Sequence, residues 1–136
     1  MQPTDVFNNP PVPNIDSLQF NPDQLIAGQF PIITGNVTVT GGAIFKRGSV
    51  LGRITASGLY TLVTAAATDG SQNPSVVLVM DVDATAGDVI GGVYKTGEFN
   101  KNKLILGTGV TLDAIEDPLR IYSIFLKDSV SAAGAN

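Results

Sequence analysis

The sequence contains no cysteine and no histidine among its 136 residues. Disulfide bonds, thiolate metal sites and zinc sites built on histidine are therefore excluded. The same two absences exclude cysteine nucleophiles, Ser-His-Asp triads and histidine general bases. Carboxylate chemistry survives this exclusion. The residues therefore argue against most enzyme classes, and we expect no metal or other cofactor.

Charge is also scarce. Charged residues make up 15% of the sequence and the formal net charge is −4, whereas about a quarter of a typical soluble chain is charged. The few basic residues are scattered, although binding to phosphates requires clustered Lys and Arg. We therefore expect no direct contact with nucleic acid. A surface with so little charge favours coverage by a partner, but a Thr-, Ser- and Asn-rich β surface would explain the composition equally well.

Long hydrophobic runs are missing too. No stretch approaches the roughly 20 apolar residues of a membrane span, and the N-terminus lacks the basic and apolar regions of a signal peptide. We expect a protein that is made and used without export and does not enter a membrane. Hydrophobic residues still make up 43% of the chain, with no tryptophan, which is enough for a modest core.

Proline is concentrated at the start of the chain. Six of the eight prolines precede residue 32, and no Lys or Arg precedes Lys46. Proline fixes φ and removes a backbone donor, so residues 1–31 are predicted to form an extended arm. Apolar side chains interrupt this arm, as expected of a segment that docks in a groove or adds a strand to a sheet. A frayed terminus with incidental hydrophobic residues is the alternative.

Short apolar runs between turn motifs predict a β-rich domain over residues 32–128. The turn motifs cover residues 46–54, 67–74, 81–88 and 97–100, each rich in Gly, Asp, Asn or Pro. The continuous run 76–80 is predicted to be the most buried strand. The other predicted strands are 37–39, 43–45, 50–54, 59–63, 89–94 and 121–126.

One short helix is predicted near the C-terminus. Thr111 is a suitable N-cap, and Asp113 places negative charge in the first turn. Leu112, Ile115 and Leu119 would form one apolar face. Pro118 limits the length of the helix. Residues 129–136 are predicted to be a flexible tail.

Two charged motifs could carry chemistry. Asp81, Asp83 and Asp88 form the densest carboxylate group, but the segment lacks the Gly and Glu positions of an EF-hand loop. We interpret these acids as strand-end and turn residues. Lys46-Arg47 could form a small basic contact point, although a solvated turn is the favoured interpretation.

Five segments together resemble the head decoration proteins of tailed bacteriophages, the family that includes the lambda decoration protein. They are 20–31 (FNPDQLIAGQFP), 46–54 (KRGxVLGxI), 67–74 (ATDGSQxP), 81–88 (DVDxxAGD) and 93–100 (VYxxGEFN). Their order and approximate spacing match the family from about residue 20 to residue 126. Met80 departs from the family pattern, because many relatives carry an acid there.

The resemblance implies a mainly β fold, a small barrel or tulip-like domain with one short helix and an extended Pro-rich N-terminal arm. It implies no enzymatic activity. It further implies a homotrimer on the outer surface of the virion, made in the host cytoplasm, that binds the major capsid protein at local threefold sites after the shell expands. There it would stabilise the head against DNA pressure. The residues expected to dock the arm on the capsid are Pro10, Pro11, Val12, Pro13, Ile15, Leu18 and Phe20.

Two other functions remain open at this point. A carbohydrate- or host-surface-binding β module displayed on a virion would need a clustered aromatic patch. A carboxylate-based enzyme would need Asp81, Asp83 or Glu98 to face one another in a pocket.

Overall fold

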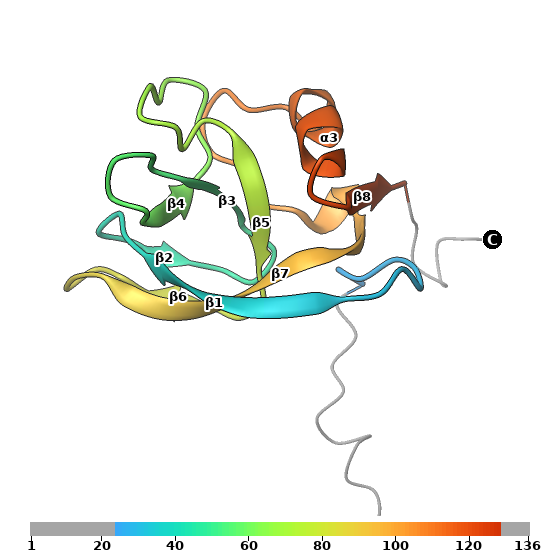
Figure 1. The fold of residues 1–136 in the computed structure, drawn as a ribbon, viewed down its shortest axis with the longest axis horizontal. Helices are drawn as coiled ribbons and strands as arrows, with labels where there is room; N and C mark the ends of the chain where they lie inside the picture. The colour runs from blue at the N-terminus through green and yellow to red at the C-terminus, as the bar shows by residue number, and fades with distance from the viewer. Residues whose placement is uncertain (1–23, 129–136) are drawn as a thin grey trace, which may run out of the picture.

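Five strands close into a barrel in the computed structural model, which describes residues 24–128 (Figure 1). β7 pairs with β5 on one edge and with β1 on the other, and this second pairing closes the barrel. The barrel strands are β1 (Ile33–Val39), β3 (Val50–Arg53), β4 (Tyr60–Leu62), β5 (Pro74–Leu78) and β7 (Val89–Asn100). The predicted mainly β fold with a barrel is therefore confirmed.

Smaller elements extend the barrel at both ends. β2 (Ile44–Phe45) and β6 (Val82–Asp83) form a separate two-stranded sheet. At the other end, β8 (Ile124–Lys127) lies parallel to the last four residues of β7. The 3-10 helix η1 (Lys101–Lys103) follows β7, and the helix α3 (Leu112–Arg120) precedes β8.

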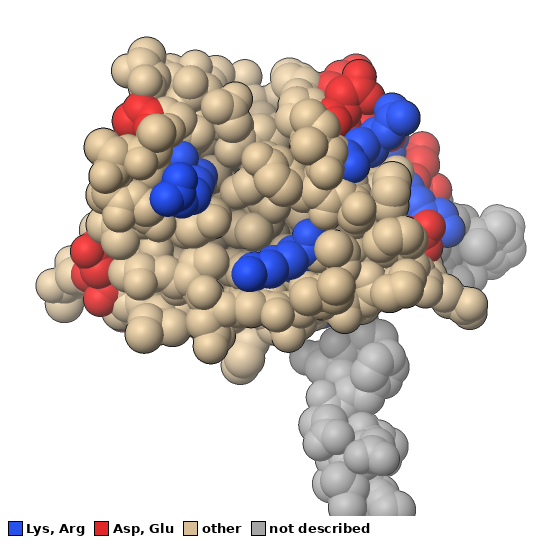
Figure 2. All heavy atoms as spheres, viewed as in Figure 1, with Lys and Arg blue, Asp and Glu red and all other residues tan. Residues whose placement is uncertain are grey.

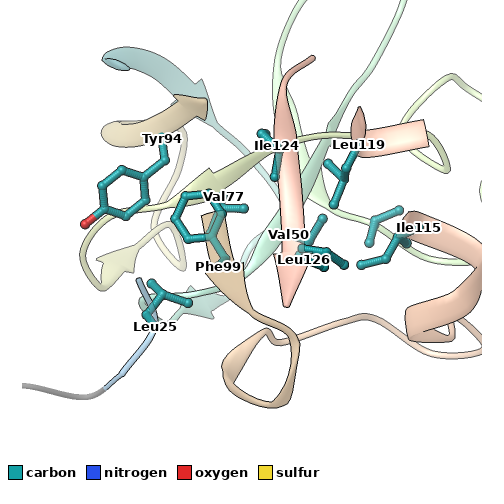
Figure 3. Packing of buried hydrophobic residues seen from close by; sticks show 10 residues of the cluster. Leu25, Val50, Val77, Tyr94, Phe99, Ile115, Leu119, Ile124 and Leu126 are labelled. Carbon is teal, nitrogen blue, oxygen red and sulfur yellow. The ribbon is translucent and has the colours of Figure 1, made fainter. Parts of the chain in front are cut away.

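The core consists of two clusters that share the barrel strands. Neighbouring residues of one strand fall into different clusters: Val50 belongs to the first and Leu51 to the second, and Val77 and Val76 are divided in the same way. Residues 50–51 of β3 and 76–78 of β5 are therefore buried on both faces, which explains why they are continuous apolar runs rather than alternating ones. The first cluster includes residues of α3 and β8, so it connects the barrel to the C-terminal elements (Figure 3).

The helix begins as predicted. The Thr111 side chain accepts a hydrogen bond from the Ala114 N–H at 3.2 Å, and Ile115 and Leu119 are buried. The helix continues through Pro118 and ends at Arg120, two residues later. The helix thus passes through Pro118, and burial of Leu119 stabilises its last turn.

The predicted turn at residues 97–100 is wrong. β7 runs through this segment to Asn100 and is paired there with β8. Gly97 has a φ of +146°, and a Cβ at this position would lie 3.0 Å from the Phe99 ring. The glycine therefore allows close packing within an extended strand, a role that its turn-forming composition does not reveal.

Two predicted strands are displaced. β5 begins at Pro74 and ends at Leu78, so the predicted run 76–80 continues two residues too far, and Met80 is 68% exposed. β8 begins at Ile124 instead of residue 121, because Tyr122 and Ser123 form a turn whose N–H groups bond to Leu119 and Arg120. Local hydrogen bonds after the helix thus delay the start of the strand.

Val77→Asp tests the assignment of the core. Val77 is fully buried in β5, and an unpaired carboxylate there should cost about 3–5 kcal/mol, a large part of the stability of a domain this size. We expect loss of the cooperative thermal transition in circular dichroism. Ile90→Asp is the matched control, because Ile90 on β7 is 73% exposed and should tolerate the charge. Equal melting temperatures for the two variants would contradict this description of the core.

Candidate functional site: the root of the N-terminal arm

The described part of the N-terminal segment pairs with β7. We call residues 25–32 the arm root. Within it, Ile26 forms an antiparallel bridge with Phe99, the Ala27 N–H donates to the Glu98 carbonyl at 2.9 Å, and the Asn100 N–H donates to the Leu25 carbonyl at 2.8 Å. β8 occupies the other edge of the same stretch of β7. The end of β7 is therefore held between the arm root and β8.

Leu25 holds the arm root in the core. Its side chain is 1% exposed and belongs to the first cluster (Figure 3). The nearby Gly48, at a φ of +93°, lies against the backbone of η1, because a Cβ there would lie 2.8 Å from the Lys103 carbonyl oxygen. Burial of one leucine side chain contributes about 1.5–3 kcal/mol. The sequence predicts residues 25–31 as part of the arm, and this segment contacts the domain through Leu25. The boundary between arm and domain after residue 31 stays a prediction.

Glu98 fixes the turn of the arm root. Its Oε1 accepts hydrogen bonds from the N–H groups of Gln29 at 2.9 Å and Phe30 at 3.3 Å. A Cβ at Gly28 would overlap this carboxylate, so any other residue there would displace the Glu98 side chain from its hydrogen bonds. Gly28 and Glu98 belong to two motifs far apart in the sequence, and their contact explains why both motifs carry these residue types.

Thr96 adds a second connection between β7 and the N-terminal segment. Its hydroxyl donates to the Pro31 carbonyl at 2.7 Å and accepts from the Ile33 N–H at 3.0 Å. Through these bonds the path of the chain is defined from the arm root into β1.

The arm root and the first residue of β1 carry exposed apolar side chains. Phe30 packs edge to face on Phe125 of β8, with ring centroids 5.0 Å apart, and Ile33 at the start of β1 is 56% exposed. We call this surface the apolar strip; it consists of Ile26, Phe30, Ile32 and Ile33. Several exposed apolar residues close together in the chain are a feature of interaction surfaces.

Both ends of the described chain lie at this end of the barrel (Figure 1). Leu25 bonds to Asn100, and Asp128, just after β8, accepts a hydrogen bond from the Asn102 side chain at 3.3 Å. Residues 1–23 and 129–136 are therefore attached to the domain near the end of β7.

The predicted arm-docking residues lie outside the described residues. They are Pro10, Pro11, Val12, Pro13, Ile15, Leu18 and Phe20. Their docking role stays a prediction, and what the structure adds is the place from which the arm begins. The sequence does not predict the arm root as a site, although Gly28 and Glu98 belong to two of the motifs shared with the family.

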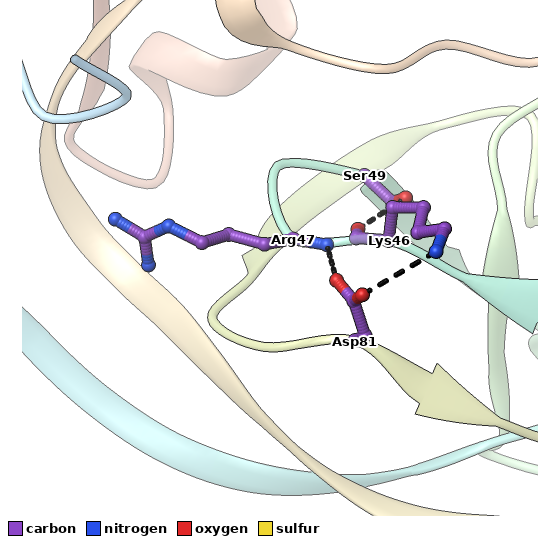
Figure 4. A network of polar contacts seen from close by, with 4 residues as sticks. All are labelled: Lys46, Arg47, Ser49 and Asp81. Carbon is purple, nitrogen blue, oxygen red and sulfur yellow. Dashed lines mark hydrogen bonds and ion pairs between the residues drawn. The ribbon is translucent and has the colours of Figure 1, made fainter. Parts of the chain in front are cut away.

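The interpretation of Lys46-Arg47 as a solvated turn is wrong for Arg47. The Arg47 guanidinium donates to the Val79 carbonyl and to the Tyr94 hydroxyl, both at 2.8 Å, and lies 5.7 Å from the Tyr94 ring centroid. Its backbone N–H donates to Asp81 at 2.8 Å, and the Lys46 ammonium lies 3.5 Å from the same carboxylate (Figure 4). Lys46 is exposed, whereas Arg47 connects two turns and β7.

Asp81 and Asp83 act as turn and strand-end residues, as interpreted from the sequence, and the interpretation of Asp88 stays a prediction. Asp83 accepts hydrogen bonds from the backbone and side chain of Thr85, and Asp69 does the same with Ser71. These bonds lower the pKa values of Asp69, Asp81 and Asp83 below the usual 3.8, with the Ser71 hydroxyl, the Arg47 N–H and the Thr85 hydroxyl as the respective main causes. Within residues 24–128 there is no group of three or more acids placed to hold a metal ion.

No helix in the described part of the chain is long and apolar enough to cross a membrane.

These features define a small β-barrel domain that presents an N-terminal arm root and an apolar strip at one end. The family model of the bacteriophage lambda head decoration protein D matches residues 19–119, well over half of the chain, and the chain therefore belongs to this family. A search of the curated proteins found no match. The predicted family is confirmed: the protein is a phage head decoration protein, a structural protein of the capsid, and this class points to a non-enzyme.

Glu98→Ala tests the role of the carboxylate in the arm root. Loss of two partly exposed hydrogen bonds should reduce the free energy of unfolding by about 1–2 kcal/mol. Amide hydrogen exchange at Gln29 and Phe30 should become faster, because their N–H groups lose their acceptor. Glu98→Gln is the control, since its amide oxygen can still accept both bonds. Unchanged exchange in the alanine variant would show that the carboxylate does not hold this turn.

The lowered pKa values predict acid sensitivity. A carboxylate with a lowered folded-state pKa adds stability above its unfolded value of 3.8, and this stability is lost as the pH falls through the folded value. We therefore expect the melting temperature to fall between about pH 5 and pH 2. Asp81→Asn should be less stable than the unaltered protein at neutral pH and should show a shallower fall.

Lys46→Met is the matched comparison for the fall in melting temperature at low pH. The hydrogen bond from the Arg47 N–H is the first cause of the lowered Asp81 pKa and remains when the Lys46 ammonium is removed. Lys46→Met should therefore change the fall in melting temperature at low pH less than Asp81→Asn does. A larger change with Lys46→Met than with Asp81→Asn, measured as melting temperature against pH, would contradict this ranking.

Proposed function

We propose that this protein cements the phage head: it binds as trimers at local threefold sites on the outside of the expanded shell, contacts the major capsid protein, and stabilises the shell against the pressure of packaged DNA. Membership of the decoration family supports attachment to the capsid. The oligomeric state, the threefold sites and the mechanical role belong to this proposal.

The observation that carries the proposal is the arm root. Main-chain pairing with β7, burial of Leu25 and the Glu98 hydrogen bonds give the arm a fixed origin. The arm therefore starts beside the apolar strip, which offers an exposed surface at the same end of the barrel. Capsid contacts by the arm and the strip would reinforce each other, because the rigid root reduces the number of geometries that binding must fix.

Burial of the apolar arm residues can offset the loss of conformational entropy when the arm becomes ordered. Fixing about six residues costs roughly 1–2 kcal/mol each, and each backbone hydrogen bond returns only about 1 kcal/mol. Strand addition alone is therefore near balance. Burial of Val12, Ile15, Leu18 and Phe20, at up to about 1.5–3 kcal/mol each, would make docking favourable.

Proline and valency lower the cost further. The prolines of the arm reduce the conformational freedom that binding removes. Three arms on one trimer raise the effective concentration of each arm after the first has docked, so no single arm needs a strong contact.

Co-sedimentation with expanded, undecorated heads of the cognate phage tests the proposal. We expect saturable binding that approaches three copies per local threefold site, and decorated heads that resist heat and chelator better than bare ones. Deletion of residues 1–20 should leave the melting temperature of the domain nearly unchanged and abolish binding, because the docking side chains are lost.

Deletion of residues 129–136 is the control for shortening the chain at the same end of the barrel, and should leave binding unchanged. Full binding by the protein without residues 1–20 would remove the arm from the proposal. Failure of the unaltered protein to bind well-formed expanded heads would remove the cementing function itself.

A further inference from the structure

A polar hollow lies on the barrel surface above β3 and β5. Its position is set by the loop after β3 and by the turn at residues 69–73, which packs so closely on β3 that a Cβ at Gly52 would overlap the Ser71 carbonyl. The turn after α3 closes the remaining side. The residues that line the hollow are Arg53, Thr55, Gly70, Asn73, Ser75 and Tyr122.

The cation in this hollow has no partner within the described chain. The Arg53 side chain takes part in no ion pair or hydrogen bond with residues 24–128. Its guanidinium lies against Gly58, where a Cβ would come within 3.3 Å of Nη2. The nearby Asp69 is engaged by Ser71. Arg53 is therefore held at the surface and is available to an acid from outside the chain.

Acidic side chains without a cation lie on α3. Asp113 and Asp117 lie on the outer face of the helix, four residues apart and opposite the buried Ile115 and Leu119. The half-buried Glu116 borders this face. Asp117 pairs with Arg120 at 3.0 Å, whereas the described residues provide no ion pair for Asp113 or Glu116. Figure 2 shows acidic side chains gathered over α3 and, in the same view, an isolated basic side chain over β3 and β4.

Apolar side chains separate the two charged regions. Ile121 and Tyr122, directly after α3, are 80% and 51% exposed. Tyr122 also lines the hollow. An exposed aromatic residue, an aliphatic residue and an unpaired arginine form the composition that is enriched at the centres of protein interfaces.

We propose that this face is a contact between copies of the protein, in which the acidic face of α3 of one copy docks on the Arg53 hollow of the next, with Ile121 and Tyr122 between them. The two halves of the contact are different surfaces, so the contact is head to tail and can close into a ring. This inference rests on the trimer of the proposed function and names the surfaces that form it.

A second copy fits the hollow because of the charge of the whole chain. With a net charge of −4, copies repel one another at long range, so association needs local pairs of opposite sign, which also fix the register. In a closed head-to-tail ring, each Arg53 would contact the acidic face of α3 of a neighbouring copy, so that every charged surface is paired.

Charge exchange tests the contact. Arg53→Glu or Glu116→Lys alone should place like charges together and raise the concentration for half-saturation of expanded heads about tenfold or more. The chain that carries both changes restores an opposite pair at every contact, and its half-saturation should return to within about threefold of the unaltered protein. Lys95→Glu is the control for the change in net charge, because Lys95 is exposed on β7.

Binding of the single variants at unaltered strength would overturn the inference. So would a double variant as weak as the single ones, which would indicate that the acid facing Arg53 comes from the capsid. Either result leaves the cementing function in place. Failure of the unaltered protein to bind heads overturns the proposed function instead.

The lack of native cysteine allows a direct second test. On decorated heads, Thr55→Cys combined with Glu116→Cys should give covalent dimers and trimers with a long flexible bismaleimide, and the ladder should end at three copies. Asp88→Cys combined with Glu116→Cys is the control pair and should give no ladder. Equal cross-linking of both pairs, or none with the first, would overturn the contact.

Discussion

The pairing of β7 on both edges is the interaction on which the rest of the molecule depends. Its first half pairs with β1 and β5 and closes the barrel, and its second half lies between the arm root and β8. One strand thus forms part of the core and also holds the segment from which the arm begins. Gly97, at the junction of the two halves, allows the close packing of Phe99 that joins them.

This shared strand links stability to attachment. Force on a docked arm would pass through Leu25 and the Glu98 hydrogen bonds into the centre of the barrel, instead of into a peripheral loop. Such a path suits the proposed cementing function, because the weakest local element determines where a structure opens.

Much of this fold could be predicted from the sequence, and three of the failures share one cause. The apolar runs of β3 and β5 and the cap at Thr111 depend on local patterns, and they were placed correctly or within two residues. The continuation of β7 through Gly97 to Asn100 and the contact between Gly28 and Glu98 depend on pairing across about 70 residues. Arg47 was misread for the same reason: its partners, Val79 and Tyr94, are distant in sequence.

The length of β7 also separates two regions of the molecule. A strand rises about 3.3 Å per residue, so the twelve residues from Val89 to Asn100 place its ends at most about 36 Å apart. The turn between β6 and β7 lies at the far end, and a side chain at Gly87 would meet no atom within 4 Å. A peptide inserted in that turn would lie far from the arm root. The barrel could therefore display an added loop without disturbing the contacts of the arm root.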